Sequence, residues 1–278
     1  MTCPELKDGK IIKGDAARLS TCMPDESVDL FVTSPPYASM RSDHYNSIEP
    51  SKYPEWFLPI SKEILRATKP TGSFVLNIKE NMTDGVRDPY VMKTVLGMMD
   101  QGWKLAETYI WNKPNAYPLK SNRRLKDGFE YAYHFVKDPK AFKIFPDNVK
   151  VPAKESGCYR MSSVKPGETT GTGSAKYTRK MAGKDCEKST VYPSNVLTIG
   201  VGSNRGAYHP ARFPPALPRF FINLLTEKGD TVVDPFAGSG TTNAEAKQLC
   251  RKTFGFDLKP EYVKNANNRI GTVSCAMQ

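Results

Sequence analysis

The sequence predicts an α/β protein whose mostly parallel sheet is covered by helices on both faces. Short strand-like segments alternate with helical ones along most of the chain, which is the order that βαβ units produce. The length of 278 residues, 39% of them hydrophobic, is ample for one large domain with a sizeable core. The apolar runs are far shorter than the roughly 18 residues that a membrane span requires. A membrane protein is therefore not expected.

Two patterns support the elements of the first half. The run VDLFVT at 28–33 is a buried-strand pattern, and it ends at two prolines that cannot join a β-ladder. Trp56, Ile60 and Ile64 recur at helical spacing. A turn is expected at 70–72, where proline and glycine occur together. Strands are thus predicted at 28–33, 73–78, 105–111 and 131–136, and helices at 53–68 and 91–99.

The alternation resumes near the C-terminus. The predicted order there is a helix at 217–225, a strand at 231–233, a helix at 242–250, a strand at 253–256 and a helix at 260–270. In open parallel sheets, ligands bind beyond the carboxyl ends of the strands. The two segments that follow the strands at 28–33 and 231–233 are therefore the first candidates for a functional site.

The positive charge is concentrated between these halves. Residues 113–190 carry 17 Lys and Arg against 8 Asp and Glu, which places nine of the eleven net positive charges in this stretch. Residues 157–188 are rich in Gly, Ser, Thr and Lys, a composition typical of long loops. This composition fits two alternatives: a solvated insertion, or a surface that binds phosphates.

The segment Asp234–Thr242 reads DPFAGSGTT and joins a predicted strand to a helix. Gly238 and Gly240 allow the backbone to approach a ligand closely, and the following helix offers free N–H groups. The segment lacks the Gly-Lys-Ser/Thr of a phosphate-binding loop. Asp257 ends the next strand, where a carboxylate can accept hydrogen bonds from ribose hydroxyls. A nucleoside-bearing ligand is therefore predicted.

Ser34-Pro35-Pro36-Tyr37 follows the strand at 28–33. The two prolines make a rigid turn, so the Ser34 hydroxyl and the Pro35 carbonyl can accept both hydrogens of an exocyclic amine. Such an amine is a poor nucleophile because its lone pair is delocalised into the base. Two fixed acceptors favour a tetrahedral nitrogen that can attack an electrophilic methyl group, and Tyr37 offers an aromatic face for the base.

These motifs together resemble those of DNA amino-methyltransferases that use S-adenosylmethionine, in the permuted class whose catalytic motif precedes the cofactor motif. The resemblance implies a Rossmann-like sheet of seven strands, a small irregular target-recognition lobe, and flipping of the target base out of the duplex. Trp111–Lys113 and Glu130 resemble late motifs of the catalytic half. The implied catalytic residues are Ser34, Pro35, Pro36 and Tyr37. The implied cofactor-binding residues are Asp15, Phe213, Asp234, Pro235, Phe236, Gly238, Gly240, Thr241 and Asp257.

The same resemblance divides the chain into a catalytic half at 1–139, a basic target-recognition region at 140–205 and a cofactor-binding half at 206–278. Duplex DNA is the expected partner. Basic residues of the middle region and its surroundings are the predicted DNA contacts: Arg41, Lys113, Arg123, Arg124, Lys154, Arg160, Lys176, Arg179 and Lys180.

The target base is predicted from what the chain contains and lacks. Methylation at C5 of cytosine requires a thiolate, usually in a Pro-Cys dipeptide, and no Pro-Cys occurs. Ser at position 34 is more usual in N4-cytosine members of the family, so N4 of cytosine is predicted and N6 of adenine is the alternative. A DNA-binding protein without activity and an RNA or protein-glutamine methylase are more distant alternatives. The chemistry demands no dedicated strong base, because the proton can leave to Ser34 or to water.

The remaining expectations concern redox state, location and assembly. The six cysteines are scattered without a Cys-x-x-Cys pair, so we expect reduced thiols and no metal site. No secretory signal is visible, and a cytoplasmic protein encoded by a bacterium or phage is expected. A monomer or weak dimer is expected, and the resemblance to restriction–modification enzymes makes a cognate endonuclease a candidate partner. His134, in an apolar strand, is expected to be a core histidine.

Overall fold

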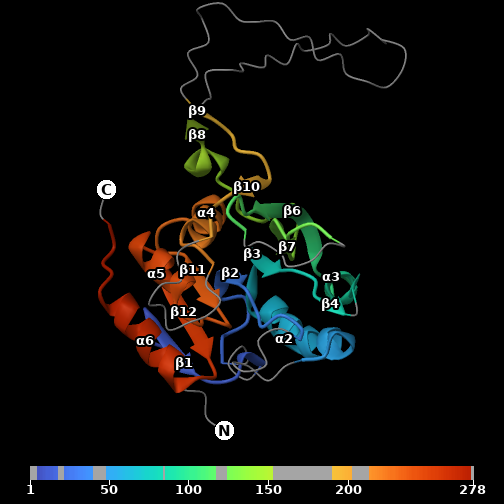
Figure 1. Cartoon of the computed structure of the whole chain (residues 1–278). Helices are drawn as coiled ribbons and strands as arrows, with labels where there is room; N and C mark the ends of the chain where they lie inside the picture. Colours follow the sequence, from blue (N-terminus) through green and yellow to red (C-terminus); the bar gives the residue numbers. More distant parts are fainter. Residues whose placement is uncertain are drawn as a thin grey trace, which may run out of the picture.

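The computed structural model describes residues 5–17, 22–39, 48–83, 85–116, 124–152, 190–201 and 213–276. An eight-stranded sheet runs through the middle of the molecule, with helices on either side (Figure 1). In spatial order its strands are β1 (Lys10–Lys13), β12 (Lys252–Asp257), β11 (Thr231–Asp234), β2 (Val28–Thr33), β3 (Thr68–Ile78), β7 (Phe129–Val136), β6 (Lys104–Asn112) and β10 (Val196–Thr198).

The sheet is mostly parallel, as predicted. Only β7 runs against its neighbours, β3 and β6, and all the other neighbouring strands are parallel. Eight strands take part where the resemblance implied seven. The strands β1 and β10 have four and three residues, too few to show a periodic pattern, and parallel pairing with β12 and β6 defines them.

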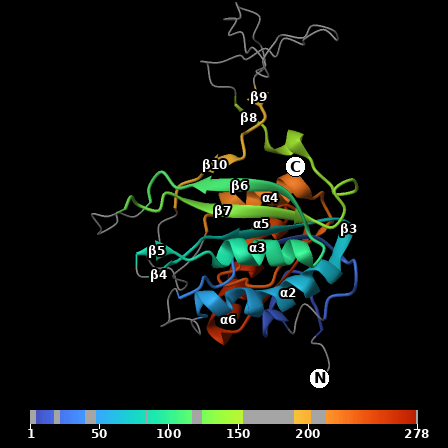
Figure 2. The ribbon, with the colours of Figure 1, turned by 90° about the vertical axis from the view of Figure 1, so that its right-hand side faces the viewer.

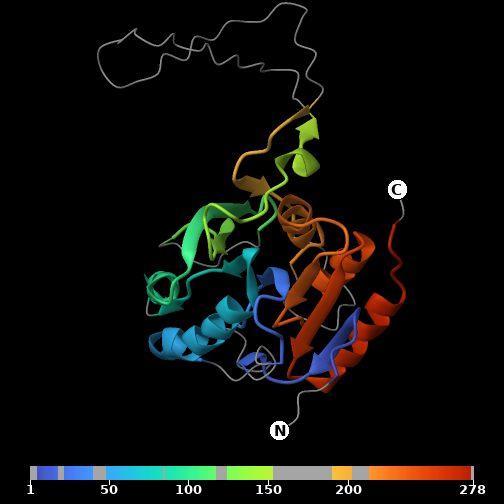
Figure 3. The same ribbon diagram turned by 180° about the vertical axis from the view of Figure 1, so that it is seen from behind.

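Helices cover both faces because the strands are apolar on both sides. In β2, Phe31 packs with α2 (Tyr53–Ala67) and α3 (Tyr90–Asp100) in one core cluster. Its neighbours Leu30 and Val32 pack with α4 (Ala216–Leu225) in a second cluster. Figures 2 and 3 show these opposite layers. The helices α5 (Thr241–Gln248) and α6 (Pro260–Gly271) pack on each other beside β12 and β1.

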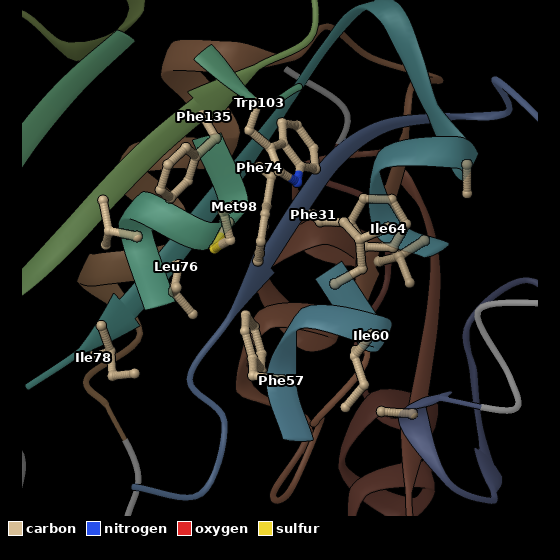
Figure 4. Close-up of a cluster of buried hydrophobic side chains, with 14 of the residues drawn as sticks. Phe31, Phe57, Ile60, Ile64, Phe74, Leu76, Ile78, Met98, Trp103 and Phe135 are labelled. Carbon is tan, nitrogen blue, oxygen red and sulfur yellow. The ribbon is translucent and has the colours of Figure 1, made fainter. Parts of the chain in front are cut away.

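The core beneath α2 and α3 is aromatic. Phe74 of β3 lies 5.5 Å from the Trp103 ring and 6.2 Å from the Phe135 ring, centroid to centroid (Figure 4). The one polar atom of the Trp103 ring is satisfied, because its Nε1 donates to Ser61 Oγ at 3.0 Å. Large rings in such contact account for much of the burial on this side of the sheet.

The topology places the two suspected segments together. β2 leads on to β3 in one direction across the sheet, while its other neighbour, β11, leads on to β12 in the opposite direction. The register pairs Val232 with Leu30 and Val233 with Phe31, so both strands end at the same edge. This is the switch point at which open α/β sheets bind their ligands.

Short elements complete the described chain. They are the helical turns η1 (Pro50–Lys52) and η2 (Pro146–Val149), the hairpin of β4 (Met82–Thr83) with β5 (Val86–Arg87), and the pair β8 (Val151–Pro152) with β9 (Thr190–Val191). Among the described residues, no helix has both the length and the apolar character needed to cross a membrane.

Two expectations were wrong. The turn expected at 70–72 is part of β3, because the register slips between Val28 and Leu30 and the extra residues form an irregularity in the strand.

Cys250 and Cys275 form a disulfide with Cα atoms 4.8 Å apart, where reduced thiols were expected. The pairing depends on how the chain after α6 returns to the end of α5, where the Ala276 amide donates to the Gln248 carbonyl. No sequence spacing reveals that return.

Candidate active site

The glycine loop between β11 and α5 is built around positive φ angles. Gly238 has φ 51° and Gly240 has φ 69°, which side chains rarely adopt. A Cβ on Gly240 would also lie 2.9 Å from the Cβ of Ala266, so only glycine lets α6 pack this closely. The Gly238 amide donates to Asp257 Oδ2 at 2.9 Å. The loop and the carboxylate after it are therefore one structural unit.

Asp257 lies half-buried at the end of β12, as the sequence predicts. Its Oδ1 accepts the Lys259 amide at 2.9 Å, and each oxygen retains acceptor capacity. Burial raises the pKa of this carboxyl above its ordinary value, while the backbone hydrogen bonds oppose the shift. Asp15 follows β1, whose Lys13 pairs with Asp257, so the two carboxylates share one edge of the sheet. Asp15 is exposed and its Oδ1 accepts the Ala17 amide at 2.9 Å.

Asp234 has an internal role that the sequence did not reveal. The residue is 2% exposed, and its Oδ1 accepts the Thr33 hydroxyl at 2.6 Å and the Phe236 amide at 3.0 Å. Its Oδ2 accepts the Thr242 hydroxyl at 2.7 Å. Because Thr33 directly precedes Ser34, Asp234 ties the end of β2 to the glycine loop. Asp234 is therefore a structural bridge in this protein, and its contact with the cofactor stays a prediction.

Burial raises the pKa of Asp234 from its ordinary value of 3.8 to about 6, despite the three hydrogen bonds. The folded protein therefore binds this proton more tightly than the unfolded chain does. The stability that this proton adds is complete below the unfolded pKa and is lost as the pH rises through the folded pKa. We expect the free energy of unfolding of the wild type, relative to Asp234→Asn, to fall by about 3 kcal/mol between pH 3.8 and pH values above 6. Urea unfolding of both proteins across this range measures the difference, and curves that stay parallel would contradict it.

The other residues of the cofactor half lie around this loop. The Phe236 ring is half-buried and lies 5.8 Å from the Trp56 ring of α2, centroid to centroid. Pro235 is buried and Phe213 is half-buried against the α4 cluster. Thr241 is buried, and its Oγ1 accepts from Arg269 Nη1 at 2.8 Å and lies 3.1 Å from Ser239 Oγ. The Thr241 hydroxyl is thus bonded within the protein.

The catalytic turn leaves β2 and meets polar side chains from two other strands. Ser34 Oγ donates to the Tyr37 hydroxyl at 3.0 Å, and the Tyr37 hydroxyl donates to Glu130 Oε2 at 2.8 Å. The Tyr37 ring is half-buried against the α2 and α3 cluster, so only part of it can face a base. Burial, and next the charge of Glu130, raise the Tyr37 pKa well above its ordinary value. Within the turn, Pro35 is buried and Pro36 is half-buried.

Glu130 is the second residue of β7 and forms an ion pair with Lys113, which follows β6. The two side chains are 9% and 12% exposed, and Lys113 Nζ also lies 4.3 Å from the centroid of the Trp111 ring. Burial lowers the pKa of Lys113, whereas Glu130 raises it. The Lys113 ammonium is thus held inside the site by Glu130 and Trp111, and its contact with DNA stays a prediction. Sequence reasoning noted Glu130 only through the resemblance and did not foresee its contact with Tyr37.

Of the remaining residues singled out in the sequence, the structure describes Arg124 and His134. Arg124 is half-buried and its Nη1 lies 3.3 Å from Asp127 Oδ1. His134 is a core histidine, as expected: its Nε2 lies 2.9 Å from Ser73 Oγ, and burial lowers its pKa to about 4. The other predicted DNA contacts lie outside the described residues: Arg41, Arg123, Lys154, Arg160, Lys176, Arg179 and Lys180. Among the residues that are described, no cluster of His, Cys, Asp or Glu is arranged to hold a metal ion.

Comparison with known proteins identifies the family. Residues 28–268 match the sequence model of a DNA methylase family, which covers N6 and N4 methylases. The chain is a member of this DNA methylase family. It is 35% identical to the type II methyltransferase M.PvuII of Proteus hauseri, over 92% of this chain and 82% of that protein. It is 28% identical to M.BglII of Bacillus subtilis, over 94% of this chain and 68% of that protein.

Solved structures share the fold of this DNA methylase. The PvuII DNA methyltransferase, described as cytosine-N4-specific, superposes with a TM-score of 0.72 at 30% identity, over 98% of this chain and 89% of that chain. M1.HpyAVI in complex with S-adenosylmethionine superposes with a TM-score of 0.60 at 20% identity, over 94% and 98% of the two chains, which shows a common fold. The family and the fold class predicted from the sequence of this DNA methylase are confirmed.

Proposed function

We propose that this DNA methylase transfers a methyl group from S-adenosylmethionine to the exocyclic N4 amine of a flipped cytosine in duplex DNA. The observation that carries the proposal is the position of the Ser34–Tyr37 turn, which ends β2 directly beside the glycine loop that ends β11. The cytosine assignment rests on Ser34 and on the 35% identity to M.PvuII, whose structure is described as cytosine-N4-specific. An acceptor pair and a nucleoside site at one sheet edge suit methyl transfer to a base amine.

The residues around the glycine loop fit the cofactor. Asp257 retains acceptor capacity for ribose hydroxyls, Asp15 lies on the same edge of the sheet, and the Phe236 ring is only half-buried beside Trp56. When bound, the cofactor supplies an electrophilic methyl group on a sulfonium. The protein's own contribution is to hold that group at the sheet edge where Ser34 holds the amine, so positioning and polar stabilisation carry the rate.

The division of the chain follows from the same assignment. Residues 1–139 and 206–278 supply the two halves of the site, and 140–205 read the DNA target. Within this middle region, Val151–Pro152 pairs with Thr190–Val191 in an antiparallel ladder. The basic side chains of the region neutralise phosphates, and affinity for DNA then falls with added salt. Base-edge contacts from the same region set the recognition sequence.

The setting of the enzyme is inferred from its relatives, which are bacterial type II methyltransferases. It acts in the cytoplasm, where its DNA substrate is found. It works as a monomer or a weak dimer, because one base is modified per encounter. A restriction endonuclease that cuts the same site is its candidate partner.

The product of the reaction tests the proposal. Duplex DNA incubated with the protein and S-adenosylmethionine is expected to yield N4-methylcytosine when its nucleosides are separated and weighed by mass spectrometry. N6-methyladenine without N4-methylcytosine would transfer the assignment to adenine. If no methylated base is found, the alternative of a DNA-binding protein without activity is supported instead. Preferential methylation of RNA would exclude duplex DNA as the substrate.

A further inference from the structure

We propose that Ser34, Tyr37 and Glu130 form a relay that carries the proton released by the methylated amine away from the base. The inference rests on the proposed function and adds an end point to it, because the proton then leaves neither to Ser34 alone nor directly to water. The three residues come from two places in the chain: the turn after β2 supplies Ser34 and Tyr37, and the start of β7 supplies Glu130.

The hydrogen bonds of the relay all point in one direction. Ser34 Oγ donates to Tyr37 Oη at 3.0 Å, and Tyr37 Oη donates to Glu130 Oε2 at 2.8 Å. With its proton committed to Tyr37, Ser34 Oγ has free lone pairs for an amine hydrogen. The chain of donors therefore begins at the group that meets the substrate amine and ends at a carboxylate.

Among the described contacts of the Tyr37 hydroxyl, Glu130 is the carboxylate, and its Oε2 can take over the proton that it already shares in a hydrogen bond. Asn77 Oδ1 lies 3.4 Å from the same hydroxyl, but an amide oxygen does not accept a proton near neutral pH. The amide of Asn77 is oriented by its Nδ2, which donates to the Tyr131 carbonyl at 2.9 Å. Asn77 thus helps to place the hydroxyl, and the carboxylate can receive the proton.

The surroundings keep each relay group in the form that its role needs. Burial and the nearby Glu130 hold the pKa of Tyr37 well above its ordinary value, so the phenol keeps a proton to pass on. Lys113 contacts Glu130 Oε1 and leaves Oε2 to Tyr37. The contact with Lys113 holds the carboxylate in place with its second oxygen toward Tyr37. Lys113 acts here as a positioning residue.

The step balances as follows. The N4 nitrogen forms its bond to the methyl carbon while the methyl carbon separates from sulfur, which keeps the electron pair. One hydrogen of the now cationic nitrogen moves to Ser34 Oγ, the Ser34 proton moves to Tyr37 Oη, and the Tyr37 proton moves to Glu130 Oε2. The base leaves neutral and Glu130 becomes a neutral carboxylic acid, which returns its proton to solvent by the same path after the product has left.

Three variants test the relay: Tyr37→Phe, Glu130→Gln and the two combined. Each single variant is expected to slow single-turnover methyl transfer by about 30-fold, less than the roughly 100-fold or more of a dedicated general base, because water can still take the proton. The combined variant is expected to be no slower than either single variant, since all three interrupt one chain. Loss of the relay also makes the rate rise with pH, as hydroxide replaces Glu130. Affinities for DNA and for S-adenosylmethionine, measured separately, are expected to change less than threefold.

A second pair of variants separates the relay from a structural role of the ion pair. Glu130→Gln leaves Lys113 without its partner and destabilises the fold, whereas adding Lys113→Met removes the unpaired charge. The double variant is expected to recover the urea-unfolding midpoint but not the transfer rate. Glu245→Gln is the matched control, because Glu245 is 7% exposed and pairs with Arg219 away from the relay. It is expected to lose stability and keep the wild-type rate.

Each outcome decides the matter. A wild type that transfers no methyl group overturns the proposed function and the relay with it. An active wild type together with wild-type rates in Tyr37→Phe or in the Glu130→Gln and Lys113→Met double variant overturns the relay alone. The relay is also overturned if the combined variant of Tyr37→Phe and Glu130→Gln loses rate by the product of the two single losses. The other ionisable groups that act on Tyr37, Lys113 or Tyr90 are Tyr90 itself, Lys79, Glu80, Asp88 and Asp127. All of them stay unchanged in every variant, so a pH profile that differs between variants reports on the relay.

Discussion

Replacing Ser34 with alanine is expected to slow methyl transfer to DNA by about 100-fold, or about 2.7 kcal/mol in the activation barrier. The hydroxyl is the acceptor closest to the amine in the proposed mechanism and the first member of the relay. Its loss removes an interaction that strengthens as the nitrogen becomes tetrahedral and cationic, so the effect falls on the rate rather than on binding. Single-turnover assays with saturating DNA and S-adenosylmethionine measure it.

Ser27→Ala is the matched control for this variant. Ser27 lies just before β2, at the other end from Ser34, and its Oγ donates to the Pro24 carbonyl at 2.7 Å. The control carries the same loss of a hydroxyl beside the same strand, and it is expected to keep the wild-type rate. A Ser34→Ala variant as fast as this control would exclude the amine-acceptor mechanism, although the protein would remain a DNA methylase.

The sequence was sufficient to predict the two motifs and the edge of the sheet on which they meet. Each motif carries its own local signal, prolines after a strand in one case and glycines before a helix in the other, and parallel strands end at a common edge. The positions of β1 and β10 were not predictable, because three or four residues show no period. The turn expected at 70–72 was wrong because proline and glycine signals also occur at a strand irregularity.

The contacts within the site were harder to predict than its location. Glu130 lies 93 residues from Tyr37 in the sequence, and they meet only because β7 is antiparallel and its first residues reach the carboxyl edge of β3. Asp234 was expected at the cofactor because it begins the glycine loop, yet its oxygens are bonded to Thr33, Phe236 and Thr242. Side-chain partners across strands depend on register and strand direction, which local patterns do not contain.

Asp257→Ala is expected to weaken binding of S-adenosylmethionine by about 30-fold or more, since hydrogen bonds to a charged group contribute about 1.5–3 kcal/mol. The carboxylate is the acceptor offered to the ribose at the end of β12. Calorimetric titration without DNA measures the loss directly, and titration with S-adenosylhomocysteine is expected to show the same loss, because both ligands carry the ribose. Affinity for DNA is expected to stay within threefold of the wild type.

Asp257 also accepts backbone amides and so orders the loop. Its control must therefore lose a carboxylate that accepts a backbone amide at a position away from the cofactor site. Asp138→Ala meets this need, because Asp138 Oδ1 accepts the Lys140 amide at 2.8 Å in the same spacing by which Asp257 Oδ1 accepts the Lys259 amide at 2.9 Å. If both variants bind the cofactor equally well, Asp257 only holds the loop. If Asp257→Asn recovers the unfolding midpoint but not the affinity, the charge itself serves the ribose. The carboxylate would then act twice, on the Gly238 amide that shapes the loop and on the ligand that the loop holds.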